Sequence, residues 1–120
     1  MEKNINVSGT GNIVNVAEII SNVTNTINTN LEKSNVDKEI LNLIADLKGQ
    51  FETVAPKAEP SQIKKMGKNL ERLSEEIAEE EPDKRWYDIS LEGIREAAEA
   101  IGDIASPIIK TVVKLATLIP

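Results

Sequence analysis

The chain has 120 residues, a net charge of −6 and three aromatic residues, and it contains neither cysteine nor histidine. This length suits a single domain over residues 1–120. Without cysteine there is no disulfide, and without histidine the commonest general base and metal ligand are both missing. The acidic balance argues against nucleic-acid binding, which depends on lysine and arginine. We expect a protein that is not an enzyme, because these catalytic groups are missing. We also expect it to be cytoplasmic, because residues 1–10 lack the apolar core of an export signal.

Residues 1–16 form an Asn/Gly/Val-rich leader that carries little charge. Polar and apolar residues alternate on both sides of the Gly-containing segment 8–11, which is typical of a β-hairpin. The edge of a hairpin readily pairs with another chain. The interface residues predicted in the leader are Ile5, Val7, Val14 and Val16.

Residues 17–81 are predicted to be helical segments. From Val16 to Leu31 the apolar residues recur every three or four positions, as on one face of a helix. The same stretch is rich in asparagine and β-branched residues, which are weak helix formers. A helix is therefore favoured here, and a strand is the alternative.

Two further helices are expected in this region, over residues 36–54 and 61–80. Ser34 and Asp37 resemble a capping box that opens the first of them. The second carries a heptad seam formed by Ile63, Met66, Leu70, Leu73 and Ile77.

The helix over residues 61–80 has an unusual charge order. Lys64, Lys65 and Lys68 lie near its beginning, and an acidic run from Glu75 to Glu81 lies near its end. The acidic run lacks the pattern of a calcium loop and is interpreted as a solvated helix face. The order opposes the helix dipole but suits an antiparallel neighbour with the same order, such as a second copy.

Residues 82–89 are predicted to be a loop around Pro82 that carries Trp86. The indole either packs the loop onto the bundle or anchors a partner, since tryptophan is frequent at interface hot spots. Trp86 is therefore included among the interface candidates.

Residues 90–119 are predicted to form one long amphipathic helix, whose apolar residues keep a heptad register throughout. Pro107 either kinks this helix or opens a second one after Ser106, and the unbroken register favours the kink. The apolar seam is core, an oligomer interface or a lipid-facing surface. Its predicted interface residues are Leu91, Ile94, Ala98, Ile101, Ala105, Ile108, Val112, Leu115 and Ile119.

No catalytic, cofactor-binding or metal-binding residue is predicted. Ser8, Ser61 and Ser90 have no histidine to act as their base. Gly9 and Gly11 are not followed by the third glycine of a dinucleotide-binding loop.

The leader over residues 4–16, the segment 85–93 and the Ala/Ile-rich helix that follows resemble small accessory or effector-associated modules of bacterial conflict (defence) systems. In such proteins an Asn/Gly/Val-rich leader precedes helical adaptor segments. The resemblance implies a role in signalling or assembly, and no catalytic residue carries over.

The sequence thus predicts a mainly α protein: an antiparallel bundle of coiled-coil-like helices with a short N-terminal β-hairpin or strand. We expect a non-catalytic protein–protein interaction and homo-oligomerisation module, whose partners are itself and another protein and not nucleic acid. It is expected to need no cofactor. The alternative is a membrane-surface effector that acts through the C-terminal amphipathic helix.

Overall fold

Five α-helices make up most of the chain that the computed structural model describes, which is residues 15–80 and 84–118. They are α1 (Val16–Lys33), α2 (Lys38–Val54), α3 (Pro60–Ile77), α4 (Lys84–Ile101) and α5 (Ser106–Leu118), joined in part by the 3-10 helices η1 (Ala55–Lys57) and η2 (Asp103–Ala105). These residues contain no strand. The predicted mainly α class is confirmed, whereas the predicted hairpin lies outside the described residues, apart from the last two residues of the leader.

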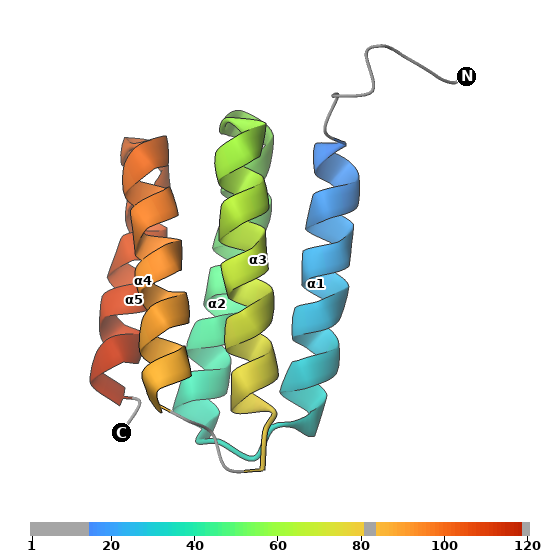
Figure 1. Ribbon diagram of the computed structural model, residues 1–120, viewed down its shortest axis with the longest axis vertical. Helices are drawn as coiled ribbons and strands as arrows, with labels where there is room; N and C mark the ends of the chain where they lie inside the picture. Colours follow the sequence, from blue (N-terminus) through green and yellow to red (C-terminus); the bar gives the residue numbers. More distant parts are fainter. Residues whose placement is uncertain (1–14, 81–83, 119–120) are drawn as a thin grey trace.

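The helices are arranged in two layers (Figure 1). α1, α3 and α4 lie side by side in the front layer, and α2 and α5 lie behind them. Each helix runs antiparallel to the one before it, so α3 is parallel to α1 and antiparallel to α4. α3 packs mainly against α1 and α4, and α5 packs against α4 and α2. α3 is therefore the central helix of the front layer.

The apolar face of α3 explains the position of the core. Ile63, Met66, Leu70, Leu73 and Ile77 recur every three or four residues, and all five are buried. They belong to the same core as buried residues of the other helices, among them Ile27, Ile44, Leu47, Phe51, Ile94 and Leu115. Burial of one large aliphatic side chain stabilises the fold by roughly 1.5–3 kcal/mol. The core is thus mostly aliphatic, as the scarcity of aromatic residues predicts.

α1 confirms the helix that the sequence favours over a strand. Its N-terminus is capped by Asn15, whose Oδ1 accepts a hydrogen bond from the backbone N–H of Glu18 at 3.1 Å. Val23 and Ile27 are buried in the bundle. Because tertiary packing outweighs weak intrinsic helix propensity, the many asparagines and β-branched residues do not prevent the helix.

The predicted capping box before α2 is wrong. Asp37 precedes α2, but its side chain makes no capping hydrogen bond. The hydroxyl of Ser34 instead donates to the backbone carbonyl of Ile77 at 2.8 Å and accepts from the N–H of Val36 at 3.3 Å. Ser34 therefore links the end of α1 to the end of α3, which lies far along the sequence.

The loop predicted at residues 82–89 is also wrong where the structure describes it. α4 begins at Lys84, so Trp86 and Tyr87 lie in a helix. Tyr87 is buried and extends by one turn the apolar face that continues at Leu91. This shared periodicity, which the prediction overlooked, extends the helix back to Lys84.

The single helix predicted for residues 90–119 is wrong because the chain turns at Gly102. This residue has φ 108° and ψ −159°, a conformation essentially restricted to glycine. α5 then begins at Ser106 with Pro107 in its first turn, where the missing N–H of proline breaks no helical hydrogen bond. α4 and α5 form an antiparallel hairpin, and the heptad register survives because both arms bury their apolar faces in one core.

Candidate interaction surface

The structure places most of the predicted C-terminal seam inside the bundle. Ile101 is half-buried at the end of α4, and Val16 is half-buried at the start of α1. The predicted interface residues that lie outside the described part of the chain are Ile5, Val7, Val14 and Ile119. Those buried in the chain's own core are Leu91, Ile94, Ala98, Ala105, Ile108, Val112 and Leu115. Within the described residues, a surface that is free to contact another molecule must use side chains other than these seven.

Four large apolar side chains are exposed in the described residues. Trp86 is 54% exposed and Ile89 55%, both on α4. Val113 of α5 is 54% exposed, and Ile104 of η2 is 47% exposed. All four belong to the hairpin formed by α4, η2 and α5. Trp86 and Ile89 are three residues apart and are therefore neighbours on the helix surface; we call these two residues the α4 apolar pair.

The α4 apolar pair lies on the side of α4 that faces α3. Gly93 marks this side, because a Cβ atom on it would clash with the side-chain amide of Asn69 in α3. Trp86 and Ile89 precede Gly93 by seven and four residues, so they share its side of the helix. Tyr87, next to Trp86, is buried. The tyrosine therefore fills the packing role considered for the tryptophan, whose indole is largely exposed.

The sequence prediction of the interface includes Trp86 but omits Ile89, Ile104 and Val113. The signal that could reveal Ile89 and Val113 is an apolar residue on the charged side of an amphipathic helix. Ile89 shares its side of α4 with Glu96, and Val113 follows Lys110 by three residues on α5. This signal becomes readable only when the limits of α4 and α5 are known.

A shallow groove of about 350 Å³ lies between α4 and α5. Arg95 lines it, and its guanidinium contacts Glu99 Oε2 at 3.1 Å and Glu92 Oε2 at 2.6 Å. The hydrogen bond with Glu92, followed by the negative charges of Glu92 and Glu99, raises the pKa of Arg95 above its usual value. Because two carboxylates neutralise this guanidinium, the groove is poorly suited to an anionic ligand.

A second groove of about 350 Å³ lies between α2 and the start of α5. Its lining includes Ala45, Gly49 and Thr53, which recur every four residues on α2. The exposed Ile104 and Pro107 line the other side. Nearby, Gln50 Nε2 donates to Thr111 Oγ1 at 3.0 Å, while Gln50 Oε1 is buried without a hydrogen-bond partner. The groove has room for a side chain of another protein, but its lining does not define the chemistry of that side chain.

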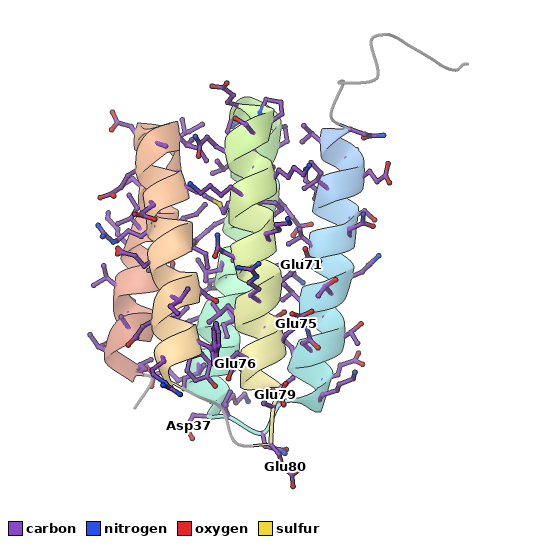
Figure 2. All side chains as sticks on the ribbon, viewed as in Figure 1. Asp37, Glu71, Glu75, Glu76, Glu79 and Glu80 are labelled. Atoms are coloured by element: carbon purple, nitrogen blue, oxygen red, sulfur yellow. The ribbon has the colours of Figure 1, made fainter. Side chains whose placement is uncertain are left out.

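The acidic residues of α3 lie in its C-terminal half, and Glu79 and Glu80 follow just beyond the helix (Figure 2). Glu71, Glu75 and Glu79 follow one another at intervals of four residues. Glu71 Oε2 accepts a hydrogen bond from Thr26 Oγ1 of α1 at 3.0 Å. Within the described ranges, no three side chains of Asp, Glu, His or Cys are grouped so that they could hold a metal ion.

Comparisons with known proteins leave the function to be argued from this geometry. The chain matches no protein-family model, no curated protein and no solved structure. None of the helices in residues 15–80 and 84–118 has the length and apolar character needed to cross a membrane. The resemblance to modules of bacterial conflict systems stays a prediction.

Proposed function

We propose that the chain is a non-catalytic protein–protein interaction module that assembles with copies of itself and with a second protein. The observation that carries the proposal is the α4 apolar pair, in which two neighbouring side chains are each more than half exposed. The other large apolar residues of α4 are buried or half-buried. Exposed apolar surface of this kind commonly marks an association site, and tryptophan is a frequent interface anchor.

Composition and surface shape support a role without catalysis. The chain has no histidine and no cysteine, so a serine nucleophile would lack its usual base. A small-molecule site is usually a deep, mainly apolar pocket with a few convergent polar groups. The two grooves described above are shallow instead, and the guanidinium in one of them is already bound to two carboxylates.

The alternative, a membrane-surface effector, has less support from the packing. It requires the apolar face of the C-terminal helix to meet lipid. Ile108, Val112 and Leu115 are buried in the bundle, so α5 would first have to detach. Detachment would cost roughly 1.5–3 kcal/mol for each large apolar side chain that it uncovers. We therefore favour the interaction module.

A place in bacterial defence rests only on the resemblance of residues 4–16, residues 85–93 and the Ala/Ile-rich helix that follows. In that role the module would be a cytoplasmic adaptor that brings an effector into an assembly. Bacteria lacking the gene would then be more sensitive to phage infection, and unchanged sensitivity would remove the defence role. The interaction module itself does not depend on this assignment.

Light scattering on the purified chain tests the proposal. We expect a mass at least twice that of one chain, which is 13.2 kDa. The double variant Trp86→Ala/Ile89→Ala should lower this mass and keep its helical circular dichroism, because both side chains are more than half exposed. Val113→Ala, which removes an equally exposed side chain from α5, is the matched control and should assemble as the wild type does.

A monomeric wild-type chain at micromolar concentrations would contradict the proposal. If that monomer also co-sedimented with anionic liposomes, the membrane-surface alternative would replace it. Self-association that is unchanged in the Trp86→Ala/Ile89→Ala variant would mean that the α4 apolar pair is not the contact.

A further inference from the structure

The solvent face of α3 carries basic residues followed by acidic ones. Lys64 and Lys68 lie in its N-terminal half, Arg72 and Glu75 lie in its C-terminal half, and Glu79 lies two residues beyond its last residue, Ile77. All five are exposed, and they follow one another at intervals of three or four residues. This spacing places Lys64, Lys68, Arg72 and Glu75 along one side of the helix, and Glu79 continues the series just beyond its C-terminus. We call these five residues the α3 charge stripe.

The charge order of this stripe is unfavourable within its own chain. Cations near the N-terminus of a helix and carboxylates near its C-terminus oppose the helix dipole. Neighbouring helices do not compensate, because Lys64, Lys68, Glu75 and Glu79 form no side-chain hydrogen bond or ion pair in the described part of the chain. The stripe thus has charge that a complementary partner would neutralise.

The four outer residues of the stripe are complementary to themselves in reverse order. Its midpoint lies between residues 71 and 72: Lys68 and Glu75 are equally distant from this point, and so are Lys64 and Glu79. In a second copy laid antiparallel, Lys64 would face Glu79 and Lys68 would face Glu75. A two-fold axis would repeat both pairs with the roles of the copies exchanged.

Arg72 lies at the centre of the stripe, so the antiparallel arrangement would bring the Arg72 side chains of the two copies level with each other. The four outer charges therefore determine the pairing. A parallel arrangement would place like charges opposite each other along the whole stripe. Since like charges in contact repel, the charge order selects the antiparallel arrangement.

The α4 apolar pair lies beside the midpoint of the stripe. Gly93 is level with Asn69, and α4 runs antiparallel to α3. Ile89, four residues before Gly93, is therefore level with Leu73, about 2 Å from the midpoint at 1.5 Å per residue. The two-fold axis would bring the Ile89 side chains of both copies close together, with Trp86 one turn away. The apolar pair would supply the water-excluding contact, and the charges would set its orientation.

From this arrangement we infer that two copies form an antiparallel dimer in which their α3 charge stripes pair about a two-fold axis. The inference rests on the proposed function and names the surface of self-association. It identifies the partner by chemistry, because the charges that complement Lys64, Lys68, Glu75 and Glu79 are those of the same four residues in reverse order.

Two charge-reversal variants test the pairing. Lys64→Glu/Lys68→Glu makes both ends of the stripe acidic, and Glu75→Lys/Glu79→Lys makes both ends basic. Each variant alone should dimerise roughly tenfold or more weakly than the wild type at low salt, because like charges then face one another. An equimolar mixture should recover the dimer, because the acidic stripe of one variant complements the basic stripe of the other.

Lys110→Glu/Lys114→Glu is the matched control. These exposed lysines are four residues apart on α5, as Lys64 and Lys68 are on α3, and the substitution changes the net charge equally. The control should dimerise as the wild type does, and circular dichroism checks that every variant is folded. A wild type that dimerises while the reversals have no effect, or a mixture that stays monomeric, overturns the inference and leaves the proposed function standing. A monomeric wild type overturns both.

Discussion

Gly67 of α3 lies so close to Val23 of α1 that a Cβ atom on the glycine would be 2.8 Å from Val23 Cγ2. Phe51 and Ile19 close the same site, at 3.5 and 3.7 Å from that position. Gly67 is within a helix, so the packing and not an unusual backbone conformation requires glycine here. The absence of a side chain at this one position lets α1 approach the central helix.

Gly67→Ala should destabilise the protein although alanine favours helix. The gain in propensity is about 1 kcal/mol, whereas overpacking a buried site typically costs about 1–3 kcal/mol. We expect a lower urea midpoint with an unchanged slope. Gly49→Ala is the control: a Cβ there meets no atom within 4 Å, so that variant should be more stable, by up to about 1 kcal/mol. Equal stabilisation by both substitutions would show that α1 and α3 do not approach this closely.

Gly102→Ala should also destabilise, but through the backbone. A Cβ on Gly102 has open space around it, yet φ of 108° is strained for any other residue. Strain of this kind costs on the order of 1–3 kcal/mol. Thermal unfolding should show the loss, with helical circular dichroism preserved before the transition. A variant as stable as the wild type would mean that the turn between α4 and α5 adopts another conformation.

Ile108→Asp should unfold the bundle. Ile108 is 1% exposed, and a carboxylate buried there without a partner costs several kcal/mol beyond the lost apolar burial. Ile101→Asp, at a half-buried site, should be milder, and Lys110→Asp on the exposed side should be nearly neutral. Circular dichroism and light scattering together decide the outcome. An Ile108→Asp chain that stays helical but loses assembly would place this residue at an interface between chains.

Alkaline pH should destabilise the protein through Tyr87. Its burial, with a smaller effect of the Glu76 charge, raises its pKa from 10.0 to about 12. Between these values the unfolded chain loses the phenolic proton while the folded chain keeps it. The contribution of Tyr87 to the free energy of unfolding is therefore complete below about pH 10 and is lost as the pH rises toward 12.

The absorbance of tyrosinate measures this shift directly, because Tyr87 is the only tyrosine. In the folded chain its titration midpoint should lie well above 10, and Tyr87→Phe should lose less stability between pH 10 and 12. A midpoint at the ordinary pKa would show that the phenol is open to solvent.

The helices and their buried faces follow largely from the sequence. In α2 and α3, apolar residues recur every three or four positions, and this period indicates a helix and marks which side is buried. Residues such as Leu70 and Leu73 are thereby predictable as core. In α1 the period also proved a better guide than propensity, because packing outweighs the small preferences of single residues.

The tertiary structure decided how these helices meet, because periodicity is a local property. A continuous helix and a hairpin that turns at Gly102 share one register, so the spacing of the apolar residues could not distinguish them. Only the packed bundle buries Tyr87 while leaving Trp86 and Ile89 exposed. It also places those two side chains beside the middle of α3. The position of α4 along α3 depends on close contacts, such as that of Gly93 with Asn69. Such contacts depend on where the chain turns, which no single helix encodes.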